Sequence, residues 1–183
     1  MNYPKRKRLR LPDYDYSSEG VYFLTLCTKD RAPILSNIKK ANENDEAVAA
    51  ISLTQLGSIV QEYILSIPKA YPYINVDSYV IMPDHVHLLL RITSVPTRRA
   101  ESLAQPFATK ERYGCGIPLA GARPTASVIA QTVAVFKRLT NRDCKQTLWQ
   151  DGYYDHIIRD AQDYQTRIEY IETNPLRKIL NKE

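Results

Sequence analysis

The sequence has few of the residues that cross-link a small protein through disulfides or structural metal ions. It contains three cysteines, which are far apart and never in CxxC spacing: Cys27, Cys115 and Cys144. An odd number of cysteines at such distances argues against a disulfide framework and against a structural zinc site. The 183 residues, 44% of them hydrophobic, are instead expected to form an ordinary apolar core.

Long apolar runs are also absent. No stretch approaches the roughly 18–20 apolar residues that span a bilayer. The first 20 residues are basic and lack the apolar region of a secretory signal. No internal repeat is found. These absences predict a cytoplasmic protein without membrane contact, in which residues 1–183 form a single domain.

Positive charge is in excess, and part of it is concentrated. The net charge is +5, and a basic N-terminal arm, residues 1–18, carries five closely spaced cations: Lys5, Arg6, Lys7, Arg8 and Arg10. Such an arm is either a solvated tail or a phosphate-binding element, and the sequence leaves both open. The segment 94–124 is rich in proline, glycine and basic residues, which predicts a long irregular insertion of the kind that is usually functional or mobile.

Hydrophobic periodicity predicts an α+β fold. The expected order is a strand at 20–28, a loop at 36–48, a helix at 53–67, strands at 73–81 and 85–92, a helix at about 126–141, a short strand within 148–160 and a last helix from Asp160 to Asn174. Prolines 68 and 175 are expected to end the first and last helices. This order predicts a ferredoxin-like antiparallel sheet with helices packed on it.

Histidine is scarce, with three in the chain, yet two of them lie one residue apart in "IMPDHVHLLL". In a strand, His85 and His87 share one face, while Val86, Leu88 and Leu90 share the other. Two imidazoles at this spacing can lean toward one cation, but they can equally be partly exposed strand residues. A metal site requires a third ligand from elsewhere in the chain.

The last predicted helix offers such a ligand. Tyr164, Ile168 and Ile171 form an apolar stripe on it, and Tyr170 and Asn174, four residues apart, lie to one side of that stripe. If this helix packs beside the HVH strand, two imidazoles, an amide and a phenol come together. A divalent ion held there could polarise a phosphodiester, and a tyrosine beside it could attack to form a covalent ester that stores the energy of the broken bond.

At this level of detail the motifs match a known family. "SSEGVYFLTLCTKDR", "VIMPDHVHLLL", "YYDHIIRD", "DY" and "YIETNP" resemble the single-tyrosine HUH transposases of small bacterial insertion sequences, and among them the REP-associated tyrosine transposases. The matching motifs extend over roughly residues 14–178, except the segment 94–124. Relatives of the insertion-sequence type have a short connection in place of that segment.

The resemblance implies an enzyme that binds single-stranded or hairpin DNA and cuts one strand, leaving a 5′-phosphotyrosine and a free 3′-OH. It implies Mg²⁺ or Mn²⁺ as the cofactor, held by His85, His87 and Asn174, with Tyr170 as the catalytic nucleophile. Tyr170 is favoured among the 13 tyrosines because it has an amide four residues later in a helical context. Family members work as monomers or as homodimers with exchanged tyrosines, and the sequence leaves this open.

Several further residues have two interpretations. His156 is favoured as a hydrogen-bonded structural histidine over an accessory site residue, and Trp149 as a core residue over a stacking platform for bases. Three basic residues of the second helix, either a solvated face or a phosphate track, are DNA-binding candidates together with the basic arm: Lys137, Arg138 and Arg142.

Two other functions compete with a transposase. A domesticated DNA-binding protein of the same fold would have no need of the full set of His85, His87, Tyr170 and Asn174. A small metallohydrolase would use the histidines without the tyrosine, and would leave the basic arm unexplained.

Overall fold

The centre of the protein is a four-stranded antiparallel sheet. The structure, a computed structural model, describes residues 18–42, 45–93 and 127–180. The strands lie in the order β4-β5-β1-β6, with bounds β1 Gly20–Cys27, β4 Ile74–Ile81, β5 His85–Ile92 and β6 Tyr154–Ile158. The five cations of the basic arm and the segment 94–124 lie outside the described residues.

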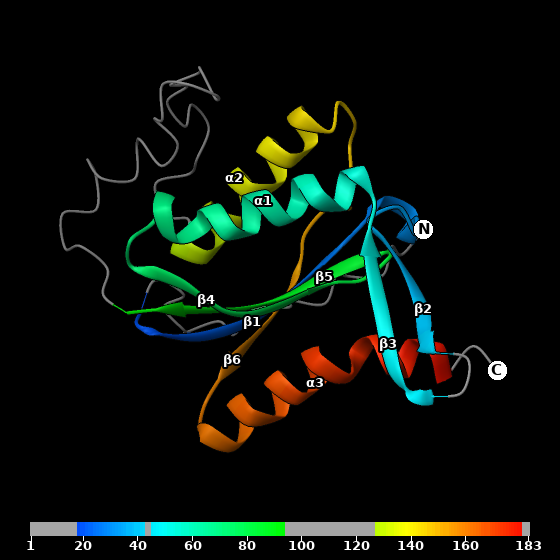
Figure 1. Cartoon of the computed structure of the whole chain (residues 1–183). Coiled ribbons are helices and arrows are strands. Elements are labelled where there is room, and N and C mark those ends of the chain that lie inside the picture. Colours follow the sequence, from blue (N-terminus) through cyan, green and yellow to red (C-terminus); the bar gives the residue numbers. More distant parts are fainter. Residues whose placement is uncertain (1–17, 43–44, 94–126, 181–183) are drawn as a thin grey trace, which may run out of the picture.

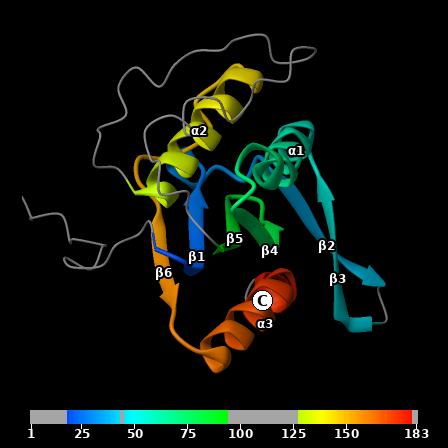
Figure 2. The same ribbon diagram turned by 90° about the vertical axis from the view of Figure 1, so that its left-hand side faces the viewer.

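Helices cover both faces of this sheet. Helices α1 (Gln55–Ala70) and α2 (Val128–Asp143) lie on one face and α3 (Ala161–Leu180) lies on the other (Figures 1 and 2). Apart from a two-stranded hairpin before α1, the order through β6 is β-α-β-β-α-β with antiparallel neighbours, which confirms the predicted ferredoxin-like arrangement. Within the described ranges, no helix is long and apolar enough to cross a membrane.

Side chains alternate across the two central strands and build a core on each face. Residues on one face, with α1 and α2, form the larger core, which includes Tyr22, Leu24, Leu26, Val86, Leu88 and Leu90. On the opposite face, Phe23 and Leu89 pack with Ile171 of α3 in a smaller core. Because alternate residues of a strand point to opposite faces, the same register places His85 and His87 on the α3 side.

The prediction of a loop at 36–48 is wrong. Residues Ser36–Asn42 (β2) and Asp45–Leu53 (β3) form an antiparallel hairpin beside α3, with a bulge between Lys40 and Asn42 (Figure 1). The hairpin forms a sheet of its own, and Ile38 is one of the few residues that it contributes to the smaller core. The segment 36–48 is mostly polar, and such a segment shows little apolar periodicity in the sequence.

The predicted helix ends are also wrong, because neither proline ends its helix. Pro68 lies within the last turn of α1, and α3 continues past Pro175 to Leu180. Proline disfavours the helical conformation in the residue before it and removes a backbone donor, but tertiary contacts can offset this cost. Asn174 and Pro175 are buried, and Lys178, a turn further on, forms an ion pair with Asp84 before β5.

Candidate functional site

The two strand histidines converge on one point. The Nε2 atoms of His85 and His87 lie 3.1 Å apart, and their ring centroids are 4.6 Å apart. Both rings are on the face covered by α3, as the alternation in the sequence predicts. Ligand atoms at neighbouring corners of an octahedron, each about 2.1 Å from its centre, lie about 3.0 Å apart. The pair therefore fits two adjacent positions around one divalent cation, although 3.1 Å is equally a hydrogen-bond distance.

Each imidazole has a partner on its other nitrogen. His85 Nδ1 lies 2.9 Å from Asp84 Oδ1, and His87 Nδ1 lies 2.9 Å from the Thr25 hydroxyl oxygen. Burial alone would raise the pKa of Asp84, but hydrogen bonds from Lys178 and His85 hold that pKa below its usual value. An ionised carboxylate can only accept, so His85 Nδ1–H donates to it, and His85 Nε2 carries a lone pair that faces His87 Nε2.

Burial keeps both imidazoles neutral. His87 is 4% exposed, and desolvation, with the neighbouring His85 adding to it, lowers the pKa of His87 to about 3. Desolvation also lowers the pKa of His85, against the opposing effect of Asp84. Neutral imidazole is the form that binds metals, so protons do not compete strongly with a cation for this pair near neutral pH.

We expect these pKa shifts to make stability depend on pH. A histidine whose pKa is lower in the folded state than its unfolded value of about 6.5 binds fewer protons when folded, so stability falls as pH drops below 6.5. For His87 this loss is about 1.5 kcal/mol between pH 6.5 and pH 5. Urea unfolding at a series of pH values measures it. Carboxylates with lowered pKa values change the stability mainly below pH 5.

A matched pair of variants isolates the contribution of His87. His87→Gln is expected to reduce the decline in stability between pH 6.5 and pH 5, whereas His156→Gln, which leaves the buried pair intact, is expected to keep it. An unchanged decline in the His87→Gln protein would contradict the assignment, because it would place the titrating group elsewhere.

Helix α3 brings the predicted tyrosine to the histidine pair. The Tyr170 ring centroid is 5.2 Å from that of His87 and 6.0 Å from that of Phe23, both in edge contacts. Asn174, one turn further along α3, is 8% exposed, and Lys178, a further turn along, donates to Asp84 Oδ1 at 2.7 Å. Residues four apart lie on one side of a helix, so Asn174 lies between two contacts to the histidine region.

Acidic, cysteine and further histidine side chains do not complete the histidine pair within the described residues. In these parts of the chain no three His, Cys, Asp or Glu side chains gather where they could hold a metal ion. Within these parts of the chain, a third side chain beside His85 and His87 would be of another kind. The Asn174 amide, located between the Tyr170 and Lys178 contacts, is the candidate that the sequence pointed to.

His156 and Trp149 have structural contacts. His156 Nε2 lies 2.7 Å from Asp163 Oδ2, which links β6 to the first turn of α3. Trp149 is 4% exposed, donates from its ring nitrogen to the Thr140 hydroxyl and packs against Phe136. The contacts agree with the interpretations favoured from the sequence, in which His156 is structural and Trp149 belongs to the core.

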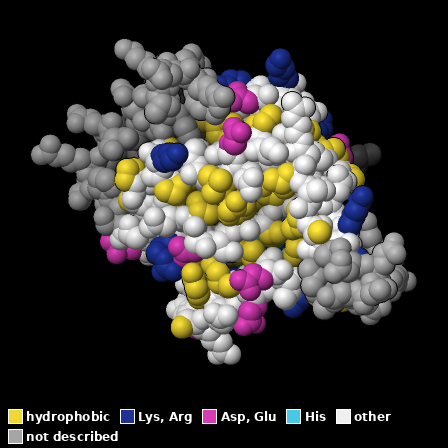
Figure 3. Space-filling model, in the orientation of Figure 1, with side chains coloured by type: hydrophobic (Ala, Val, Ile, Leu, Met, Phe, Trp, Pro, Cys, Tyr) yellow, Lys and Arg dark blue, Asp and Glu magenta, His cyan; other side chains and the backbone are white. Residues whose placement is uncertain are grey.

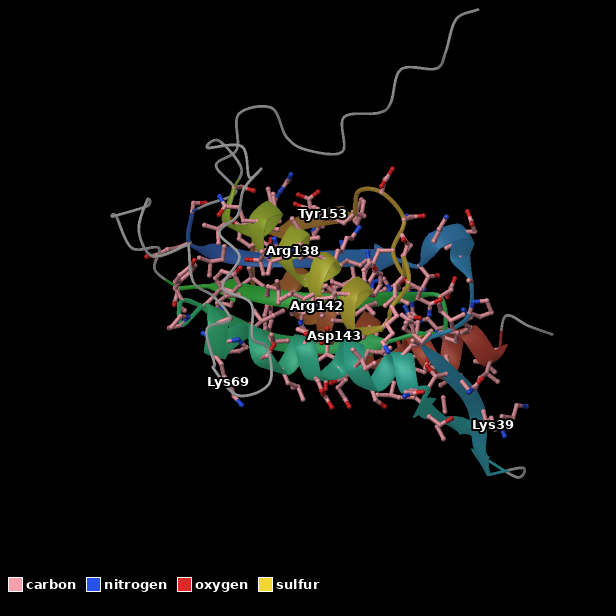
Figure 4. The ribbon with its side chains drawn as sticks, turned by 90° about the horizontal axis from the view of Figure 1, so that it is seen from above. Lys39, Lys69, Arg138, Arg142, Asp143 and Tyr153 are labelled. Atoms are coloured by element: carbon pink, nitrogen blue, oxygen red, sulfur yellow. The ribbon has the colours of Figure 1, made fainter. Side chains whose placement is uncertain are left out.

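The basic residues predicted on the second helix do not lie with the histidines. Figure 4 looks onto the side of the sheet that α1 and α2 cover, and Arg138 and Arg142 are seen there, opposite to α3. Lys137 donates to the backbone carbonyls of Gln150 and Gly152, and Arg142 pairs with Asp143 at 2.7 Å. On the face shown in Figure 3, basic side chains are scattered among acidic and apolar ones.

Sequence reasoning missed the cations that do lie near the pair. Among the described residues they include these on the α3 side of the sheet and around its edge: Arg31, Arg167, Arg177 and Lys178. The Arg177 guanidinium carbon is 5.7 Å from the Tyr170 ring centroid, and that of Arg167 is 5.4 Å from the Phe23 ring centroid. Helical spacing from Tyr170 could have indicated Arg167 within the predicted helix. It could have indicated Arg177 and Lys178 only if that helix had been extended beyond Pro175.

Comparisons with known proteins agree with this fold. No family model matches the sequence. A Haemophilus influenzae protein without an assigned function is 32% identical over 176 residues, 93% of this chain and 88% of that protein. A second protein of that organism, named "Putative REP-associated tyrosine transposase", is 22% identical over 170 residues, 89% of this chain and 74% of its own length.

A solved structure shares the fold. It is a REP-associated tyrosine transposase bound to a REP hairpin, with a TM-score of 0.54 and 15% identity, covering 92% of this chain and 74% of that one. This chain therefore has the fold of a tyrosine transposase. It belongs to one family with the first Haemophilus protein, and its resemblance to the REP-associated tyrosine transposases, recognised from the motifs, is confirmed.

Proposed function

We propose that this protein is a transposase that cuts and rejoins single-stranded DNA through a covalent bond to Tyr170. The observation that carries the proposal is the position of the Tyr170 ring, 5.2 Å from the ring of His87 in a pair of converging, neutral imidazoles. The relatives support a transposase-like function at the coarser level. A buried histidine pair without a neighbouring nucleophile would fit hydrolysis instead.

The proposed reaction is a transesterification. The Tyr170 hydroxyl oxygen attacks the scissile phosphorus, the bond from phosphorus to the 3′ oxygen breaks, and a 5′-phosphotyrosine forms beside a free 3′-OH. The tyrosine proton leaves to solvent, and the departing 3′ oxygen takes one up, so the step is balanced. Attack by a 3′-OH on the phosphotyrosine reverses the step and joins strands without an outside energy source.

In this proposal the protein's own groups orient the tyrosine and the phosphate. His85, His87 and the Asn174 amide would hold Mg²⁺ or Mn²⁺, which when bound would polarise the phosphate and stabilise charge on the leaving oxygen. The Arg177 guanidinium, near the Tyr170 ring, is placed to pair with the phosphate charge as the bond to tyrosine forms. The stack of Phe23 on His87 and the edge contact of Phe23 with Tyr170 limit the movement of both rings.

The proposed substrate is single-stranded or hairpin DNA. The solved neighbour is bound to a REP hairpin, and Arg31 and Arg177 offer partners for a phosphate backbone in this chain. Tyr170 and the histidine pair meet within one chain, so the proposal includes a site that one protomer can complete.

Covalent trapping tests this function. Labelled single-stranded oligonucleotides from the flanks of the protein's own gene are incubated with the protein and Mn²⁺, then run on a denaturing gel. A protein–DNA band that a chelator abolishes is the expected result. Cleavage without such a band would favour a metallohydrolase. Tight binding of the same DNA with neither cleavage nor a band would favour a binding protein of the same fold without turnover.

A further inference from the structure

Asp84 joins the histidine strand to the far end of α3. Its Oδ1 accepts from His85 Nδ1 at 2.9 Å and from Lys178 Nζ at 2.7 Å. The Asp84 side chain is 18% exposed, and that of His85 is 13% exposed, so little water competes for these contacts. Arg31 lies further off, at 3.7 Å from Oδ2, with a side chain that is 58% exposed. Lys178 is thus the closer and better shielded cation.

We infer that Lys178 and Asp84 are positioning residues for the proposed reaction. Lys178 orients the Asp84 carboxylate, and Asp84 holds His85 in the tautomer whose Nε2 lone pair faces His87. The same contact holds α3, and with it Tyr170 and Asn174, against the start of β5. This inference rests on the proposed function, and it adds two residues that touch neither the DNA nor the cation in that proposal.

The orientation of the Asp84 carboxylate decides whether His85 Nε2 has a lone pair available for a cation. A neutral imidazole carries one proton, and it sits on whichever nitrogen has the better acceptor. With Asp84 ionised and fixed beside Nδ1, the proton stays there, so Nε2 has its lone pair available. Without Lys178, the Asp84 side chain would be free to turn toward solvent or toward Arg31, and the preference for this tautomer would weaken.

The position of Lys178 explains why α3 continues beyond Pro175. Lys178 is eight residues after Tyr170, so it lies about 80° further around α3 and two turns nearer the C-terminal end. A cation in the last turn of a helix is also favoured by the helix dipole. Lys178 therefore acts as the second contact that fixes the helix, with the Tyr170 ring beside His87 as the first.

The test uses two measurements on the full chain without DNA. ¹⁵N NMR of labelled histidines in the metal-free protein reports the His85 tautomer, and Mn²⁺ titration followed by electron paramagnetic resonance reports affinity. The variants are Lys178→Met, Lys178→Arg and Asp84→Asn, whose amide can donate as well as accept and so no longer selects one tautomer. Lys69→Met is the matched control, because Lys69 is an exposed lysine in the last turn of α1, on the other side of the sheet (Figure 4).

We expect Asp84→Asn to give mixed His85 tautomers and to weaken Mn²⁺ binding about 10- to 100-fold, the range usual for partners of metal-bound histidines. Lys178→Met is expected to change both measurements in the same direction but less, Lys178→Arg to restore them, and Lys69→Met to change neither. In the double variant, Lys178→Met should add little to Asp84→Asn, because Lys178 acts through Asp84.

Specific results would overturn the inference. If the His85 tautomer and the Mn²⁺ affinity are unchanged in folded Lys178→Met protein, Lys178 is not a positioning residue. Additive losses in the double variant would show that Lys178 acts without Asp84. If the unaltered protein binds no Mn²⁺, the proposed function loses its metal, while the tautomer measurement still decides whether Lys178 and Asp84 position His85. Circular dichroism confirms folding. If Lys178→Met does not fold, an unchanged tautomer and unchanged Mn²⁺ affinity in folded Asp84→Asn protein would overturn the inference instead.

Discussion

Tyr170→Phe is expected to abolish the covalent protein–DNA band and the cutting of single-stranded DNA, with a loss of at least about four orders of magnitude in rate. The substitution removes only the hydroxyl oxygen, so the ring contacts with His87 and Phe23 remain. Removing the nucleophile of a covalent mechanism leaves only the residual effect of binding and charge. DNA affinity should be unchanged within a few-fold, which a gel-shift or anisotropy titration measures alongside the denaturing gel.

Tyr164→Phe is the matched control for this prediction. Tyr164 lies on the same helix and in the same smaller core, and its hydroxyl donates to Asp77 at 3.1 Å, away from the histidine pair. It should lose a structural hydrogen bond and keep the covalent band. Persistence of the covalent band in the Tyr170→Phe protein would show that another residue is the nucleophile. Metal-dependent cleavage without any covalent band would support hydrolysis.

His87→Gln and His85→Gln are each expected to slow formation of the covalent band by about three orders of magnitude. A bound cation supplies several kcal/mol of charge stabilisation in reactions of this kind. In the proposal each histidine is one of the three protein ligands of that cation. Glutamine keeps a polar side chain of similar length, so Thr25 opposite His87 retains a hydrogen-bonding neighbour. The rate of band formation across a range of Mn²⁺ concentrations measures the effect.

The control for the histidine pair is His156→Gln. His156 pairs with Asp163 at the start of α3, so this change is expected to alter stability more than the rate of band formation. Partial recovery of the His87→Gln rate at high Mn²⁺ would agree with weakened metal binding. Full activity of His87→Gln at low Mn²⁺ would exclude His87 as a ligand, and with it this form of the proposed mechanism.

The local features of the site could be predicted because each follows from the side-chain periodicity of one strand or one helix. A strand places every second side chain on one face, which is sufficient to bring His85 and His87 together. A helix places residues four apart on one side, which is sufficient to align Tyr170 with Asn174. The order of elements predicted a ferredoxin-like sheet, because the strand and helix periods are clear over the buried parts of β1, β5, α1 and α2.

Features that depend on contacts between distant segments were missed or misplaced. The segment 36–48 is mostly polar, so its sequence resembles a loop, although its residues pair in the β2–β3 hairpin. The helical conformation around Pro175 is disfavoured locally and is offset by burial and by the ion pair from Lys178 to Asp84, 94 residues away in the chain. Arg138 and Arg142 are basic in the sequence, but only the packing of α2 shows that they lie on the side of the sheet opposite to α3.

The sequence by itself determined the central strands, the face shared by the two histidines, the alignment of Tyr170 with Asn174 and the resemblance to a transposase family. These depend on periods of two or about 3.6 residues and on short motifs, which need no knowledge of distant contacts. The tertiary structure alone decided that α3 packs on the histidine side of the sheet, that it extends past Pro175, and that Asp84 and Lys178 join its end to His85. Such contacts depend on the balance of burial and charge between segments far apart in the chain, which no local pattern records.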